Sequence, residues 1–285
     1  MLPVTVFKIS EILTHKLIIV LMLKHAMKKL YFIIALIIIS SYYLSAQSTA
    51  VQKRAFQPTE KLSYNVYYSL IGIYVKAGTA TFTMSSERLQ DQDVFHVVGE
   101  GSTNPRYDWI YKVRDRYESY FSTTDLKPVK FVRNISEGKY KKREEITFDH
   151  QTNTAITKNG VYQVPENVQD VISVMYYMRE INYDKNKAGD KIAYTMFLDD
   201  KVYSLSLHYL GKETVQTRYG TFKAIKIKPL LIKGRVFEDA EKMTIWVTDD
   251  ANHIPVQVES PISVGKVMVN LIKYENLKNQ TTMVR

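Results

Sequence analysis

Short runs in which apolar and polar residues alternate make up most of this chain. Between Lys61 and Tyr68 the apolar residues fall on every second position, which is the period of a β-strand with one buried face. Similar runs continue to Tyr274, separated by turns rich in Gly, Asn, Asp and Pro. The pattern predicts a mainly β protein, in which large curved antiparallel sheets form a sandwich or an open barrel.

Two glycine positions give local detail within this pattern. Gly78 interrupts the second strand and predicts a bend or a close approach of two backbones. Asn159-Gly160 separates the strands predicted at 153–157 and 161–164. Asn-Gly favours the positive φ angles of a type I′ turn, so a tight hairpin is expected there.

One segment has a helical period instead. Between Gln169 and Asn182 the apolar residues recur at spacings of three and four, which predicts a single amphipathic helix at about 169–182. Asp170 is a suitable N-cap. The sequence indicates one β-rich domain over residues 59–279; if it has two lobes, the seam falls near 165–189.

The first 46 residues predict a leader rather than part of the fold. A basic start at Met27, an apolar run from Leu30 to Ile39 and small residues ending at Ala46 have the order of a secretory signal peptide, with translation beginning at Met27. The alternative is a retained membrane anchor, but the apolar runs are shorter than the ~20 residues that span a bilayer. Residues 47–58 are polar and are expected to be flexible.

Composition narrows the choice of compartment and partners. Without the leader the chain keeps 34 of its 39 basic and 28 of its 29 acidic residues, a mild positive charge that does not indicate nucleic-acid binding. The absence of cysteine excludes disulfides, thiol nucleophiles and a lipid-modified N-terminal cysteine. The signal peptide predicts an exported protein, periplasmic or secreted, and the absence of cysteine predicts that it has no covalent lipid anchor. They say nothing about oligomeric state.

The residues that could carry catalysis are scattered. The four histidines after the leader lack the spacing of a zinc site, and no motif for a cofactor or a nucleophile is present, so no metal and no cofactor is expected. Glu144 and Glu145 are neighbours in a strand and should point to opposite faces. Asp249 and Asp250 are expected to hydrogen bond within a turn. A non-catalytic role is favoured over an enzyme.

Basic and aromatic residues suggest binding instead. Lys139, Lys141, Lys142 and Arg143 predict either a solvated edge strand or a contact for anionic lipid or polysaccharide. Eighteen tyrosines follow the leader, and tyrosine suits both cores and concave ligand surfaces. The predicted ligand groove, between the helix and the aromatic run, comprises Tyr107, Trp109, Tyr111, Tyr117, Tyr176, Tyr177 and Arg179.

Several motifs, taken in order, resemble the bacterial domain-of-unknown-function family 3108. They are Lys61–Tyr68 with Lys76-Ala77-Gly78; Tyr117 to Tyr120 with Leu126 and Pro128; Asp170, Ser173, Tyr176, Tyr177 and Arg179; and Ile245-Trp246, His253-Ile254-Pro255 and Gly265. The resemblance covers about residues 59–276. It implies an exported, β-rich envelope protein and brings no catalytic residues. Thr59 departs from the pattern, since a glycine usually precedes the first acidic residue.

Three hypotheses of function follow. The first is a non-catalytic envelope protein that binds a lipid or glycan in an aromatic-lined groove. The second is a hydrolase of envelope material that uses carboxylates from separate strands. The third is a structural or assembly component of the envelope, which an exposed apolar patch would favour.

Overall fold

The computed structural model describes residues 54–71, 73–89, 91–230, 243–261 and 265–284. The predicted leader, residues 1–46, therefore lies outside the described residues. The strands are β1 (Lys61–Leu70), β2 (Ile73–Leu89), β3 (Gln92–Thr103), β4 (Arg114–Ser122), β5 (Pro128–Glu137), β6 (Tyr140–Asp149), β7 (Thr154–Thr157), β8 (Gly160–Gln163), β9 (Val168–Gln169), β10 (Lys191–Leu198), β11 (Lys201–Gln216), β12 (Thr221–Leu230), β13 (Thr244–Thr248), β14 (Pro255–Pro261), β15 (Lys266–Glu275) and β16 (Met283–Val284). The helices are η1 (Pro105–Tyr107), α2 (Ser173–Arg179) and η2 (Tyr183–Lys185).

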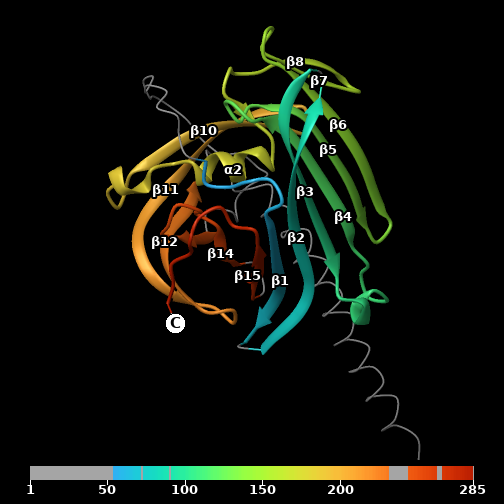
Figure 1. Cartoon of the computed structure of the whole chain (residues 1–285). Coiled ribbons are helices and arrows are strands. Elements are labelled where there is room, and N and C mark those ends of the chain that lie inside the picture. The colour runs from blue at the N-terminus through green and yellow to red at the C-terminus, as the bar shows by residue number, and fades with distance from the viewer. Residues whose placement is uncertain (1–53, 72, 90, 231–242, 262–264, 285) are drawn as a thin grey trace, which may run out of the picture.

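All the strands of the described chain belong to one strongly curved sheet. Its 16 strands follow the order β8-β7-β6-β5-β4-β3-β2-β1-β15-β14-β13-β12-β11-β10-β9, with β16 beside β12. The pairing is antiparallel except between β9 and β10. The sheet curls round α2, and among the described residues its two end strands, β8 and β9, do not pair with each other (Figure 1). The prediction of a mainly β fold with a large curved antiparallel sheet is confirmed, in the form of an open barrel.

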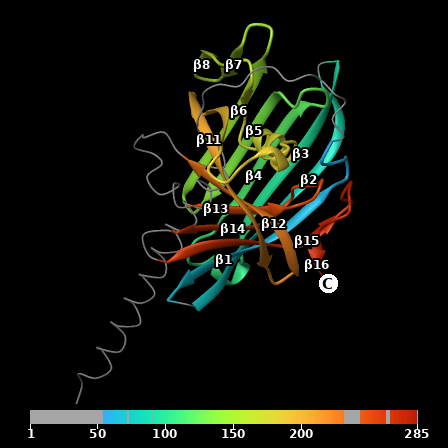
Figure 2. The same cartoon turned by 90° about the vertical axis from the view of Figure 1, so that its left-hand side faces the viewer.

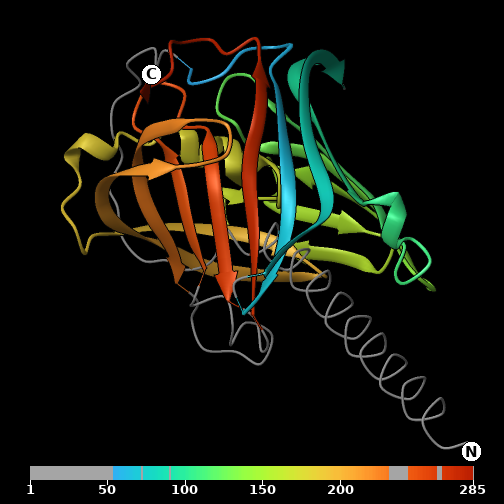
Figure 3. The ribbon, with the colours of Figure 1, turned by 90° about the horizontal axis from the view of Figure 1, so that it is seen from below.

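The beginning and the end of the domain meet in the middle of this sheet. β1 pairs with β2 on one side and with β15 on the other, so Lys61 lies opposite both Thr83 and Glu275. Figure 3 shows β1 and β15 side by side in the curved sheet. Gly78 sits where β2 passes closest to β3, and a Cβ there would lie 2.3 Å from the carbonyl oxygen of Ser102. The predicted close approach of two backbones is confirmed.

The hairpin between β7 and β8 forms, but its turn differs from the prediction. Thr157 pairs with Gly160, so the two central residues of the turn are Lys158 and Asn159. Neither is among the residues with positive φ, which excludes a type I′ turn. The hydroxyl of Thr157 accepts a hydrogen bond from the backbone N–H of Asn159 and fixes this alternative register.

The predicted helix is present but shorter than expected. α2 covers only seven residues within the predicted range 169–182. It starts late because Gln169 already pairs with β10 as part of β9. It ends early because Asn182 caps the next helix, η2, by accepting a hydrogen bond from the N–H of Asp184.

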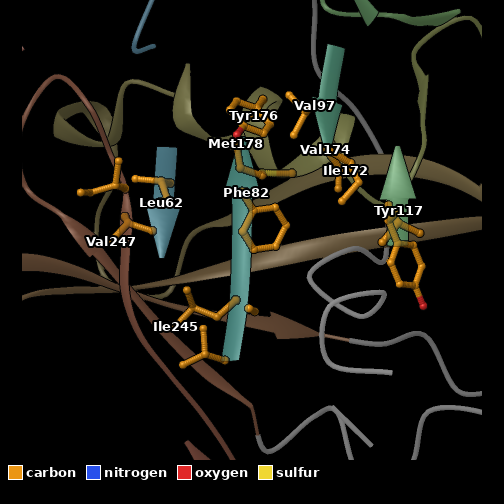
Figure 4. Packing of buried hydrophobic residues seen from close by; sticks show 14 of the residues in the cluster. Leu62, Phe82, Val97, Tyr117, Ile172, Val174, Tyr176, Met178, Ile245 and Val247 are labelled. Atoms are coloured by element: carbon orange, nitrogen blue, oxygen red, sulfur yellow. The ribbon is translucent and has the colours of Figure 1, made fainter. Parts of the chain in front are cut away.

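The core lies between α2 and the inner face of the sheet. Figure 4 shows Phe82 of β2 close to Met178 and Tyr176 of α2, with Ile172 and Val174 nearby. Residues 54–58 belong to the segment that the sequence predicts to be flexible. In the structure they pack against the same helix: the ring of Phe56 is buried, and its centre lies 5.0 Å from that of Tyr176. Within the described part of the chain, no helix is long and apolar enough to cross a bilayer.

Candidate functional site

The last residue of α2 holds a buried ion pair with the start of β1. Arg179 donates two hydrogen bonds to Glu60, at 2.6 and 2.8 Å, and a third from Nε to the carbonyl oxygen of Asn252 at 2.8 Å. Its guanidinium carbon lies 5.3 Å from the ring centre of Phe56 and 5.1 Å from that of Tyr176. Burial disfavours the charged guanidinium, but Glu60 outweighs it and raises the pKa of Arg179. This cluster joins three distant segments and is structural in character.

Asp170 organises the entry into α2. Its Oδ1 accepts hydrogen bonds from the backbone N–H groups of Ile172 and Ser173, at 2.7 and 2.8 Å, and its Oδ2 accepts one from the Ser119 hydroxyl of β4 at 2.5 Å. The prediction of a capping role is therefore confirmed, although the N-cap position itself belongs to Ile172. Burial raises the pKa of Asp170 to about 6, against the hydrogen bonds that lower it.

We expect Asp170 to give the stability of the protein a specific pH dependence. With a folded-state pKa of about 6 and an unfolded one near 3.8, the folded protein binds a proton that the unfolded chain releases, so stability from this group rises as the pH falls from 7 to 5. The gain is about 1 kcal/mol. Urea unfolding of the wild type and of Asp170→Asn at both pH values measures this gain. The contributions of the other titratable groups are the same in both proteins, so they cancel when the two unfolding free energies are subtracted. An equal difference at pH 7 and pH 5 would contradict the assignment.

The predicted groove residues fall into separate groups. Tyr176 and Arg179 are buried in the cluster with Phe56. Tyr111 and Tyr117 lie further along the inner face, where the Tyr111 hydroxyl donates to Glu137 at 3.3 Å and burial raises the pKa of Tyr111 to about 12. In Figure 4, Tyr117 lies at the edge of the displayed cluster with its hydroxyl directed away from α2.

The other three predicted residues face different surroundings. Trp109 is 68% exposed and donates from its ring nitrogen to the carbonyl oxygen of Arg106. Tyr107, in η1, is half-buried. Tyr177, on α2, is also half-buried at the margin of the core. The structure thus joins Tyr176 with Arg179, and brings Tyr111 and Tyr117 to a second region of the inner face.

The described apolar space beside α2 is small. A pocket lined by Met178, Arg179, Tyr183, Ile245 and His253, among others, has a volume of about 20 Å³. That is about the space of one water molecule. It cannot hold an acyl chain or a sugar ring.

In the described part of the chain, the two ends of the sheet are joined by side-chain contacts and not by backbone pairing. Asp199, in the β10–β11 turn, accepts hydrogen bonds from Arg133 of β5 and Lys142 of β6. Arg133 also lies 2.5 Å from Glu144. Burial would raise the pKa of Asp199, but the two cations outweigh it and lower that pKa. Further contacts link Thr157 and Asn159 to Asp200, and the rings of Phe148 and Tyr162 to Phe197.

Glu144, Glu145 and Asp250 are arranged as the sequence predicts, whereas the Asp249 carboxylate pairs with Lys212 of β11, at 2.7 Å, and not within its turn. Glu144 is buried against Arg133, whereas Glu145 is exposed and lies 2.7 Å from Lys130. Asp250 accepts a hydrogen bond from the backbone N–H of Asn252 within its turn. Among the described residues, no three His, Asp or Glu side chains gather in a way that could hold a metal ion.

A larger, polar groove lies on the sheet over β2, β3, β4 and β5. Its volume is about 470 Å³, and its lining consists of Thr79, Thr81, Glu100, Gly101, Ser102, Arg114, Asp115, Arg116 and Asn134. Antiparallel pairing places Thr81 beside Glu100, Glu100 beside Arg116, and Arg116 beside Asn134, so these residues form one row across four strands. We call this surface the outer groove.

The charges in the outer groove are balanced and held in place. Arg116 donates to Glu100 and to Glu118, both at 2.9 Å. Arg114 donates to both oxygens of Asp108, at 3.1 and 2.6 Å. The lining therefore presents fixed donors and acceptors with no excess of either charge.

An extended polar network continues along the same face. His96 contacts Glu87 at 2.6 Å and Glu118 at 3.0 Å, and its ring stacks on Tyr120 with centres 4.0 Å apart. Burial would raise the pKa of Glu118, but hydrogen bonds from Arg116 and His96 hold it below its usual value. This network fixes the side chains at one border of the outer groove.

Only part of the outer groove has a signal in the local sequence. Thr79, Thr81 and Thr83 share one face of a strand, a regularity that β propensity alone would explain. The same alternation also lines up hydroxyl groups on that face. The partners from β3, β4 and β5 depend on strand order and register, which have no local signature.

Comparisons with solved structures place the fold among β-barrel-like proteins. A β-barrel-like DUF1849 protein from Brucella abortus is 10% identical, with a TM-score of 0.52, and the match covers 78% of this chain and all of that one. A DUF1089 family protein from Pseudomonas aeruginosa is 9% identical, with a TM-score of 0.36, over 66% of this chain and 94% of that one. A Bacteroides fragilis protein with a YmcC-like fold is 13% identical, with a TM-score of 0.31, over 77% and 97%.

Comparison with curated proteins finds no significant match. The family model described as a protein of unknown function, DUF3108, matches residues 63–272. This range spans most of the domain and includes nearly all the motifs on which the resemblance was based. The chain therefore belongs to the DUF3108 family.

Proposed function

We propose that this is an exported, non-catalytic envelope protein that binds a neutral, hydroxyl-rich glycan in the outer groove. The observation that carries the proposal is the groove itself, a hollow of about 470 Å³ lined by Gly101 and otherwise by residues with hydroxyl, amide or charged side chains. Its volume is within the range of small-molecule sites. Export is supported by the order of a basic start at Met27, an apolar run from Leu30 to Ile39 and small residues ending at Ala46.

The two hollows in the described part of the chain favour a glycan over a lipid. An acyl chain needs an enclosed apolar space, and the pocket beside α2 offers only about 20 Å³. The outer groove instead offers hydroxyls from Thr79, Thr81 and Ser102 and the amide of Asn134. These groups can both donate and accept hydrogen bonds, as sugar hydroxyls do.

Charge favours a neutral ligand over a polyanion. The groove lining contains two arginines and two carboxylates, and Arg116 is already paired with Glu100. A guanidinium held beside a carboxylate offers neighbouring donors and acceptors, which suits a pair of adjacent hydroxyls. Glu100 is bound to Arg116, and Asp115 accepts a hydrogen bond from the backbone N–H of Ser136, so both carboxylates are engaged in positioning. This favours binding over the hydrolase alternative.

The test compares a variant in the outer groove with a control variant outside it. In Thr81→Val/Asn134→Ala, two groove groups are lost that no described ion pair requires. In Thr147→Val, on the same face of β6 but outside the groove, the same kind of hydroxyl is lost. Because the groove is open, we expect a Kd of about 0.1–1 mM for the wild type.

Titration of the exported protein with soluble glycans released from its own envelope, followed by calorimetry, provides the measurement. The groove variant should bind at least about tenfold more weakly, which corresponds to ~1.4 kcal/mol, whereas Thr147→Val should bind as the wild type does. Circular dichroism confirms that each variant folds. Equal binding by both variants, or no binding by the wild type, would reject the proposal.

A further inference from the structure

Several exposed apolar side chains gather at one end of strands β1 to β6. Antiparallel pairing puts the β1–β2, β3–β4 and β5–β6 connections at the same end of these neighbouring strands. Figures 1 and 2 show the β1–β2 turn and η1 at the lower end of these strands. The exposed residues there are Ile71 (92%), Ile73 (69%), Tyr74 (46%), Trp109 (68%) and Tyr140 (53%). We call this set the apolar end.

The apolar end is unusual for hairpin tips. Turns are normally built from Gly, Asn, Asp and Pro, which tolerate water and positive φ angles. Ile71 is almost fully exposed and adopts a φ of 49°, a conformation that is rare for a β-branched residue. It therefore combines exposure with backbone strain, a combination that folding alone does not favour.

The charges around the apolar end are mostly positive. Lys76, Arg106, Lys112, Lys139 and Lys141 are all exposed in or beside the three connections. The described acidic residues in or beside the same connections are Asp108 and Glu100, which are bound to Arg114 and Arg116, and Asp115 and Glu137, which are buried. A partner that meets this end therefore finds apolar tips surrounded by exposed cations.

We propose that the apolar end docks onto the surface of an anionic lipid bilayer. Tryptophan and tyrosine favour the boundary between headgroups and acyl chains, and aliphatic tips can enter it to a shallow depth. Lysine and arginine beside them are attracted to anionic headgroups. This explains why apolar, strained and basic features occur together at one end of the strands.

The docking also gives the outer groove a defined position. Ser102 and Arg114 line the groove and flank the connection that contains Trp109. A protein docked through this end would therefore hold the groove close to the bilayer. The proposal does not depend on glycan binding, because its test uses lipid alone.

Vesicle flotation of the exported protein tests the proposal. Vesicles of phosphatidylethanolamine with about one third phosphatidylglycerol present an anionic surface, and phosphatidylcholine vesicles present a neutral one. We expect binding to the anionic vesicles that weakens at least tenfold when salt is raised from about 0.05 to 0.5 M, because screening reduces the attraction.

Two variants locate the contact. Ile71→Ser/Ile73→Ser/Trp109→Ser should bind anionic vesicles at least tenfold more weakly, whereas Val161→Ser, which changes an apolar residue of similar exposure on β8, should bind normally. Trp109 fluorescence should shift to shorter wavelength on binding, and Trp109→Phe should abolish that shift, because Trp246 is buried. Unchanged binding by the triple variant would overturn the proposal. So would self-association through this end without vesicle binding.

Discussion

Replacing Arg179 with methionine is expected to destabilise the folded protein by about 3–5 kcal/mol. The change leaves Glu60, which is buried, without the cation that donates two hydrogen bonds to it. It also removes the hydrogen bond to the carbonyl oxygen of Asn252, so a buried acceptor loses its partner. Because Arg179 joins β1, α2 and the β13–β14 turn, we expect the loss to appear as a lower midpoint of cooperative urea unfolding.

The double variant Glu60→Met/Arg179→Met separates the two parts of this effect. Removing both charges leaves no unpaired ion in the core, so the double variant should be clearly more stable than the sum of the two single changes predicts. A double-mutant cycle, measured by urea unfolding, gives the coupling free energy between Glu60 and Arg179. If the two single changes were additive and each cost less than about 1 kcal/mol of stability, the buried Glu60–Arg179 ion pair would not stabilise α2.

Phe121→Ala is expected to cost a further 3–5 kcal/mol at a different place in the core, the range typical of an aromatic residue truncated where it is fully buried. Phe121 is completely buried on β4, with its ring centre 5.7 Å from that of Phe95 and 5.6 Å from that of Tyr176. The alanine variant leaves a cavity between β3, β4 and α2, because a rigid sheet cannot close over it.

Phe121→Leu is the matched control, since it keeps most of the apolar volume and should cost less than about 1.5 kcal/mol. Urea unfolding of both variants gives the comparison. Equal stability of the alanine and leucine variants would show that α2 does not pack on β4 in the way that the ring contacts indicate.

The alternation of apolar residues was enough to predict the type of fold. Local patterns also predicted features with local causes, such as the close approach at Gly78, the opposite faces of Glu144 and Glu145, and the capping by Asp170. Each follows from the geometry of one strand or one turn.

Features that depend on distant partners were not predictable. Asp199 meets Arg133 across 66 residues of chain, and Lys61 pairs with Glu275, and neither contact leaves a local sequence pattern. The turn predicted between β7 and β8 was wrong for a different, local reason: the hydroxyl of Thr157 accepts a hydrogen bond from the N–H of Asn159, which competes with the intrinsic preference of Asn-Gly.

The candidate site shows the same division. The aromatic excess is compatible with a core or with a ligand surface, and several of its tyrosines are buried: Tyr176 on α2 in one region, and Tyr117 on β4 with Tyr111 of the β3–β4 connection in another. The outer groove depends on four strands that lie side by side only after folding. Its single local signal was the row of threonines on β2.

Amide chemical-shift mapping of the isotopically labelled exported protein, titrated with its own envelope glycans, tests the central claim most directly. If the outer groove binds the glycan, the largest shift changes should cluster at residues 79–81, 100–102, 114–116 and 134, which adjoin one another on β2 to β5. Changes concentrated on Tyr111, Tyr117 and α2 would instead place the ligand at the aromatic inner face and contradict the account.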